Sequence, residues 1–228
     1  MTSSWSLRRK ISASVAIALL LIGCAVSYLS YRASMQAMEQ DVRAQVQGIS
    51  TSFGKYVSDW FAAKGKTLEA FPANADTANL LAHLTQLKIS ANVDNSFLAF
   101  ADGRLENANQ LKMAPGNDDP RVWGWYIHAN EKPGQTYIAD PSVASATGKN
   151  VVSLGRTVQT SDGRTVAVLG LDVVIDDIVS QLKQIRLPGD GYMLLSRGDN
   201  IFAHADQQLL NKPLSALAKG LSADSASR

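Results

Sequence analysis

The chain has 228 residues, a formal net charge of +2 and a single cysteine. This length favours one or two domains, and the small net charge argues against the basic surface of a nucleic-acid-binding protein, so no nucleic-acid partner is expected. One cysteine excludes an intrachain disulfide and a cysteine metal cluster. The three histidines are isolated and lack the spacing of a metal motif, so no metal or cofactor is expected.

The N-terminal segment has the pattern of a membrane anchor. Arg8, Arg9 and Lys10 precede about twenty residues without a charge, over residues 11–31. At a rise of about 1.5 Å per residue, this stretch is long enough to cross a bilayer core of roughly 30 Å. The basic cluster predicts that residues 1–10 are cytoplasmic and that the rest of the chain lies outside.

Two alternatives remain for this segment. Residues 21–24, Leu-Ile-Gly-Cys, resemble a lipoprotein cleavage box that would place lipid on Cys24, but the apolar stretch continues beyond the cysteine. A cleavable secretory signal would have a shorter apolar region and an A-x-A-like site, which this stretch lacks. An uncleaved transmembrane helix is therefore the favoured interpretation.

Residues 32–70 are predicted to form one long helix. Apolar side chains recur at steps of three and four residues between Val42 and Phe61, which gives a single apolar stripe. Such a length suits a stalk that carries a signal, or the seam of a homodimer. Strict heptads are not sustained, so a helix is better supported than a coiled coil. A long helix that flanks its own domain is the alternative, and it is compatible with a stalk.

Residues 71–186 change from helical to strand patterns. Asp76 is a plausible N-cap for a helix, and Asp162-Gly163 is a hairpin turn. Helices are predicted over 76–88, 119–130 and 176–184, and strands over 96–100, 135–139, 150–158 and 165–173. A long helix followed by strands joined through hairpins predicts an α+β fold with an antiparallel sheet.

Residues 187–228 are interpreted as the start of a second, smaller module. Strands are predicted over 189–195 and 201–204, with a turn over 197–200. About forty residues cannot bury a core of ordinary size. We therefore expect this module to be incomplete and the chain to be part of a longer protein.

Residues 119–126, DPRVWGWY, combine two tryptophans, a tyrosine and an arginine in one short stretch. Aromatic faces with carboxylates nearby can bind a small cation, through cation–π attraction and charge-assisted hydrogen bonds. Packing of Trp123 and Trp125 into a core is the alternative. Candidate carboxylates are Asp140 and Asp172.

Several motifs in this order resemble the double-Cache sensor of bacterial methyl-accepting chemotaxis proteins. They are a charged start, one apolar span, a long helix, SFLAFADGR, DPR-x-x-x-WY, TGK-x-V, VAVLGLDVVIDDI and LPGDGYMLL, over residues 4–214. The resemblance implies two stacked PAS-like modules in the periplasm and an anchor in the bacterial inner membrane. The membrane-distal module, residues 71–186, would bind a small ligand.

The same resemblance implies ligand-binding residues. Trp125 and Tyr126 match a Trp-Tyr pair that amino-acid-binding members use, Tyr137 matches a later tyrosine, and Asp172 matches their last aspartate. Asp140 stands for an earlier aspartate, although it lies one residue further from the tyrosine than in the family.

One departure from the family bears on the ligand. Trp123 stands where the relatives have the arginine that binds a ligand carboxylate through two parallel hydrogen bonds. The absence of this arginine favours a ligand that has an amine but no carboxylate, such as a polyamine or a biogenic amine. Arg121 could replace the missing arginine, which keeps amino acids as the second ligand class.

Catalysis is not expected, because the chain has neither a nucleophile elbow nor a phosphate-binding loop. A membrane-anchored periplasmic enzyme is the alternative of another class. The same sensor architecture also serves histidine kinases and diguanylate cyclases. A chemotaxis role, with cytoplasmic signalling partners, is therefore an expectation from resemblance rather than from residues in this chain.

Overall fold

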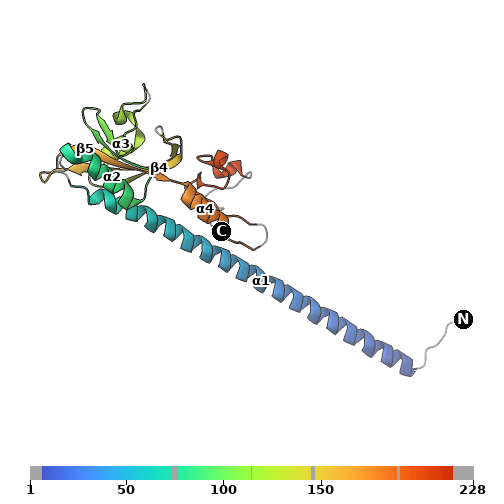
Figure 1. Cartoon of the computed structure of the whole chain (residues 1–228). Helices are drawn as coiled ribbons and strands as arrows, with labels where there is room; N and C mark the ends of the chain where they lie inside the picture. Colours follow the sequence, from blue (N-terminus) through green and yellow to red (C-terminus); the bar gives the residue numbers. More distant parts are fainter. Residues whose placement is uncertain (1–6, 73–76, 114, 145–146, 189–190, 218–228) are drawn as a thin grey trace. The chain divides into compact units, whose positions relative to one another are not determined.

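The computed structural model describes residues 7–72, 77–113, 115–144, 147–188 and 191–217 (Figure 1). The chain divides into two compact units, Met1–Ser52 and Phe53–Arg228. One helix, α1 (Leu7–Glu69), begins in the first unit and ends in the second. The two segments predicted as 11–31 and 32–70 thus form a single continuous helix.

In the first unit, the apolar side chains of α1 are exposed. Leu19, Leu20 and Ile22 are between 61% and 68% exposed. By its length and composition, this part of α1 could cross a membrane. In the second unit, α1 buries a stripe of residues one helical turn apart, namely Val57, Phe61, Lys64, Gly65 and Leu68.

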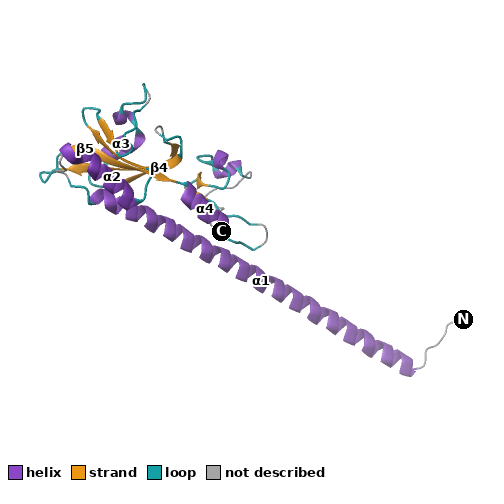
Figure 2. Cartoon of the chain, in the orientation of Figure 1, coloured by secondary structure: helices purple, strands orange, loops and turns teal. Residues whose placement is uncertain are grey.

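The second unit contains a five-stranded antiparallel sheet, which confirms the predicted α+β fold (Figure 2). The strands lie in the order β2-β1-β5-β4-β3, so β5 and β4 are interior strands. Their bounds are β1 (Asn95–Phe100), β2 (Leu105–Asn107), β3 (Tyr137–Val143), β4 (Asn150–Gln159) and β5 (Thr165–Val174).

The two faces of this sheet have different partners, because successive residues of a strand point to opposite sides. Leu154, Leu169 and Leu171 are fully buried in the main core, which also includes residues of α1 and of α2 (Leu80–Ala91). Ser153 and Asp172 are register partners on β4 and β5, and they point to the opposite face. This second face carries the site described below.

One strand prediction needs correction, and one strand was missed. β3 lies further along the chain than the predicted 135–139, because Gly134, at a φ of 79°, and Gln135 belong to a turn closed by the Gln135 N–H and the Lys132 carbonyl. The three-residue strand β2 was not predicted, since so short a segment shows no alternation that could reveal it.

The helix predicted over 76–88 is also displaced. A 3₁₀ turn over Thr77–Asn79 precedes α2, which begins at Leu80 and ends at Ala91. Asp76, the predicted N-cap, lies outside the described residues. Asn92 ends α2 in the left-handed conformation, at a φ of 49°.

Lys64 of α1 joins this helix to the end of α2. Its ammonium group donates hydrogen bonds to the carbonyl oxygens of Ala91 and, at 3.3 Å, of Asn92. Burial lowers the pKa of Lys64, and the nearby carboxylate of Asp177 opposes that effect. The C-terminal end of a helix, with its partial negative charge, is a favourable partner for a buried ammonium group.

The last described part of the chain follows α4 (Asp176–Gln184), whose bounds match the prediction. β6 (Leu195–Arg197) and β7 (Asn200–Ala203) pair as a two-stranded sheet. Of the strand predicted over 189–195, only Leu195 lies in a strand, the first residue of β6. Residues 191–194 are not in a strand, and residues 189 and 190 lie outside the described part.

Candidate functional site

The helix predicted over 119–130, which contains the aromatic segment 119–126, is divided into two short helices. Pro120–Val122 is a 3₁₀ turn that begins at Asp119, whose carboxylate accepts a hydrogen bond from the Arg121 N–H at 3.0 Å. Trp123 then adopts an extended conformation, with a ψ of 141°, before α3 (Gly124–Glu131). This break between the helices places Trp123 and Trp125 in the lining of the same cavity.

Two glycines allow close packing over the sheet, by α3 above Gly155 and by the Phe97 ring of β1 above Gly170. Gly155 and Gly170 are register partners on β4 and β5. A β-carbon at Gly155 would lie 2.6 Å from the carbonyl oxygen of Trp125, and one at Gly170 would overlap the ring of Phe97. Phe97 and Trp125 fill this space, with ring centroids 4.7 Å apart.

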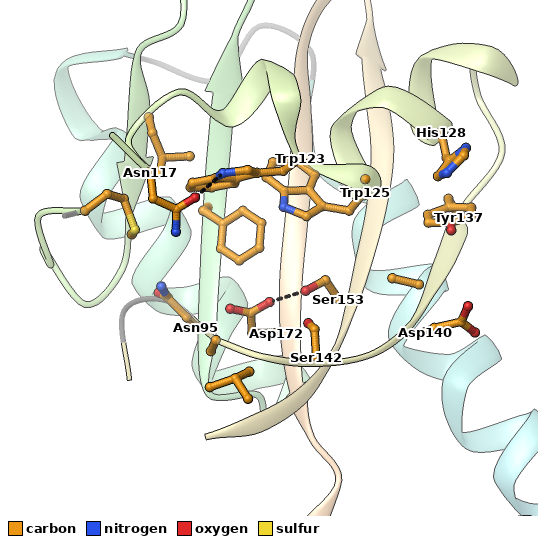
Figure 3. Close-up of a pocket in the computed structure, with 17 residues that line it drawn as sticks. Asn95, Asn117, Trp123, Trp125, His128, Tyr137, Asp140, Ser142, Ser153 and Asp172 are labelled. Atoms are coloured by element: carbon orange, nitrogen blue, oxygen red, sulfur yellow. Dashed lines mark hydrogen bonds between the residues drawn. The ribbon is translucent and has the colours of Figure 1, made fainter. Parts of the chain in front are cut away.

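A cavity of about 420 Å³ opens beside these rings (Figure 3). Its lining is aromatic on one side and polar on the other. The aromatic residues are Phe97, Trp123, Trp125, His128 and Tyr137, the neutral polar residues are Asn95, Asn117, Ser142 and Ser153, and the carboxylates are Asp140 and Asp172. None of the described residues that line the cavity is a lysine or an arginine.

Trp123 forms one wall of the cavity. Its indole N–H donates a hydrogen bond to the side-chain oxygen of Asn117 at 3.1 Å, and its ring centroid lies 6.0 Å from that of Trp125. His128 and Tyr137 stack at the other end of the aromatic wall, with centroids 4.7 Å apart. Figure 3 shows the pair of Trp123 and Trp125 and the pair of His128 and Tyr137.

Asp172 is the carboxylate that projects from the sheet into the cavity. One of its oxygens accepts a hydrogen bond from the Ser153 hydroxyl at 2.7 Å (Figure 3). Burial raises the pKa of Asp172 to about 6; the charge of Asp94 adds to this rise, and the Ser153 hydrogen bond opposes it. A cationic ligand beside this group would favour its ionised form.

Asp140 lies on the rim of the cavity and already has a partner. Nη1 of Arg197 donates to one of its carboxylate oxygens at 3.0 Å. The Asp140 side chain is 63% exposed, so its surroundings differ from those of Asp172. The register of β3 against β4 shifts between Ile138 and Pro141, and this irregularity lets both Ala139 and Asp140 line the cavity.

Two of the seven residues predicted for the site are not part of the described lining. Arg121 forms a two-pronged ion pair with Asp119, at 2.9 and 2.8 Å, and its guanidinium holds the pKa of that carboxyl at about 2. In this structure it therefore does not supply the charge that would bind a ligand carboxylate. Tyr126 packs edge-on against Trp125, with centroids 6.1 Å apart.

The sequence places this chain in a known family. Residues 34–226 match the family model of the Cache domain. The chain belongs to the Cache domain family. The membership confirms the resemblance inferred from the motifs, and the match covers the five-stranded sheet and α1 from residue 34 onward.

Curated relatives of this Cache domain are chemotaxis receptors. The methyl-accepting chemotaxis protein McpB of Bacillus subtilis is 24% identical over 84% of this chain and 30% of its own length. The protein McpG of Pseudomonas putida is 26% identical over 79% of this chain and 28% of its own length. The chain thus spans less than a third of the curated relatives that it matches.

Solved structures share the fold of this Cache domain. The ligand-binding domain of the Pseudomonas fluorescens chemoreceptor CtaA, in complex with L-isoleucine, matches with a TM-score of 0.70 at 22% identity, over 82% of this chain and 78% of that chain. The corresponding domain of Pseudomonas aeruginosa PctC, in complex with GABA, has a TM-score of 0.69 at 22% identity, with 80% and 85% covered. The Cache domain match and the curated relatives, which are named methyl-accepting chemotaxis proteins, agree with the expectation that the chain is not an enzyme.

Sequence reasoning missed the polar residues next to Asp172. Asn95 and Ser153 are its register partners on β1 and β4 in this Cache domain. Counting pairs back from the hairpin turn at 161–164 would have placed Ser153 opposite Asp172. His128 lies three residues after Trp125 on α3, whereas Asn117 comes from a loop that carries no such signal.

The raised pKa of Asp172 predicts a pH-dependent stability. Because the folded state binds this proton more tightly than the unfolded state, the contribution of Asp172 is fully present below about pH 4 and is lost as the pH rises through about 6. Relative to Asp172→Asn, the free energy of unfolding of the wild type is expected to fall by up to roughly 3 kcal/mol between pH 4 and pH 7. Urea titrations followed by tryptophan fluorescence measure this difference. A constant difference across the range would contradict it.

Proposed function

We propose that this Cache domain is the ligand-sensing region of a bacterial chemoreceptor and binds a small amine-bearing molecule. A polyamine or a biogenic amine is the favoured class, and an amino acid is the second. One observation carries the proposal: a cavity with aromatic walls and the buried carboxylate of Asp172, without a lysine or arginine among its described lining residues.

The chemistry of the cavity suits an ammonium group better than a carboxylate. An ammonium group can bind the ionised Asp172 through a charge-assisted hydrogen bond, and aromatic faces such as Trp123 attract a cation. None of the described lining residues offers a guanidinium to a ligand carboxylate. Arg121 is paired with Asp119, and Arg197, at the rim, is paired with Asp140. L-Isoleucine and GABA, bound by the related domains, each carry an amine and a carboxylate, so they support an amine-bearing ligand and keep amino acids as the second class.

The proposed arrangement in the cell follows from α1. Residues 11–31 would span the inner membrane, with residues 1–10 in the cytoplasm and the sheet unit in the periplasm. Residues 71–186 would be the membrane-distal, ligand-binding module, and residues 187–228 the start of the proximal one. A homodimer through α1 would carry the signal to cytoplasmic partners, and output through a histidine kinase or a diguanylate cyclase is the alternative.

The membrane assignment predicts that the chain resists alkaline carbonate extraction of cell membranes. Arginines at the centre of a spanning helix cost about 3 kcal/mol each, so Leu20→Arg/Ile22→Arg is expected to reduce the membrane-bound fraction. Val42→Arg, which lies beyond the predicted span, serves as the control and should stay in the membrane pellet. Release of the wild-type chain by carbonate would rule out the anchor.

The proposed function predicts binding of histamine or putrescine by the purified full chain in detergent at pH 7.5. Asp172→Asn is expected to lose about 2–5 kcal/mol of binding free energy, because the ammonium group is left without its charged partner. Isothermal titration calorimetry measures the loss. Asp59→Asn, which removes an exposed carboxylate of α1, is the control and should bind like the wild type. Unchanged affinity in Asp172→Asn would place the ligand elsewhere.

The presence of Trp123, in place of an arginine, predicts which of two matched ligands has the higher affinity. Histamine and L-histidine differ only in the carboxylate, and the wild type is expected to prefer histamine. Trp123→Arg adds the guanidinium that a carboxylate needs, so the ratio of the two affinities should shift toward histidine by about tenfold or more. Trp123→Phe keeps an aromatic face without the charge and should retain the preference for histamine. An unchanged ratio in Trp123→Arg would show that residue 123 does not face the ligand carboxylate.

A further inference from the structure

Arg197 reaches the rim of the cavity from the two-stranded sheet. The residue ends β6, and its guanidinium lies over the ring of Phe202 on β7, at 4.7 Å from the ring centroid. Nη1 of Arg197 lies within hydrogen-bond distance of three acceptors on β3: the carbonyl oxygen of Ile138 at 3.1 Å, that of Ala139 at 3.2 Å, and the carboxylate of Asp140 at 3.0 Å.

These contacts change the charge that the cavity offers to a ligand. Asp140 and Asp172 both line it, and two free carboxylates would suit a molecule with two ammonium groups. The carboxylate of Asp140 is instead paired with a guanidinium that belongs to the same chain. A second ligand ammonium would have to displace Arg197 from three acceptors and would be repelled by its charge.

The rim segment is also held from a second position. The side-chain amide of Asn211 donates a hydrogen bond to the carbonyl oxygen of Pro141, the residue after Asp140. The irregular part of β3, between Ile138 and Pro141, is therefore bound on both sides of Asp140 by residues that follow α4. This arrangement holds the backbone on both sides of Asp140, which keeps that residue within reach of Arg197.

We propose that Arg197 determines specificity by occupying Asp140, so that the cavity selects ligands with one ammonium group over diamines. Asp172 then remains as the single carboxylate without a cationic partner among the described lining residues. The inference rests on the proposed function and narrows it to monoamines. Among the amines considered above, it favours biogenic monoamines over polyamines such as putrescine.

A pair of matched ligands tests this role. n-Butylamine and putrescine have the same carbon chain and differ in the second ammonium group. In calorimetry with the full chain in detergent at pH 7.5, the wild type is expected to bind n-butylamine more tightly than putrescine. Arg197→Gln should shift the affinity ratio toward putrescine by at least about threefold, since Asp140 becomes free. Arg197→Gln/Asp140→Asn should cancel that shift.

Controls separate this effect from a general loss of structure. Arg156→Gln removes another arginine that pairs with a carboxylate, Glu69, away from the cavity lining, and it should keep the wild-type ratio. Arg197→Met keeps an apolar stem over Phe202 and should shift the ratio in the same direction as Arg197→Gln, which keeps the test open if the glutamine variant does not fold. If a folded Arg197 variant keeps the wild-type ratio of the two affinities, the role inferred for Arg197 is wrong, whereas the proposed function stands. Failure of the wild-type chain to bind any amine overturns the proposed function as well.

Discussion

Gly155 on β4 and Gly170 on β5 are paired across the centre of the sheet, and the space above them is occupied by the Trp125 carbonyl and the Phe97 ring. Interiors of proteins are packed to the density of organic crystals, so even one added methyl group would have to displace its neighbours. The position of α3 depends on this close contact. The aromatic wall depends in turn on α3, because Trp125 and His128 both project from that helix.

The same sheet meets two different requirements on its two faces. On one face, leucines such as Leu154 and Leu171 are fully buried in the main core. On the other face, Ser153 of β4 lies beside Asp172, the one charged residue of the largely apolar strand β5. Burying a carboxylate is costly unless it gains a partner, and the raised pKa of Asp172 reflects this cost. A cationic ligand would recover part of it, so affinity and stability are linked at this residue.

Local patterns in the sequence were enough to predict most of the fold. The bounds of α4 matched, and β4 and β5 were predicted to within one residue at each end, because long apolar runs with turn signals at both ends are strong local information. α2 was displaced because Asp76 resembles an N-cap, whereas the helix begins only after a 3₁₀ turn. The length of α1 followed from an uninterrupted apolar and helical pattern.

The candidate site could be predicted only in part. Five of the residues predicted for the site line one cavity, namely Trp123, Trp125, Tyr137, Asp140 and Asp172, and their binding of a ligand stays a prediction. The pairing of Arg197 with Asp140 could not be predicted, because the two residues are 57 positions apart and meet only through tertiary structure. Arg121 was considered as a replacement for the missing arginine, and in the structure its guanidinium pairs with Asp119, two residues away.

The hydrogen bonds of Lys64 determine how α1 is oriented about its own axis. Each residue of an α-helix advances by about 100° around the axis, so a shift of one position would carry the ammonium group away from the carbonyls of Ala91 and Asn92. Asn92 lies three residues before Asn95, which lines the cavity on β1. A rotation of this part of α1 about its axis would therefore require the hydrogen bonds between Lys64 and the end of α2 to break.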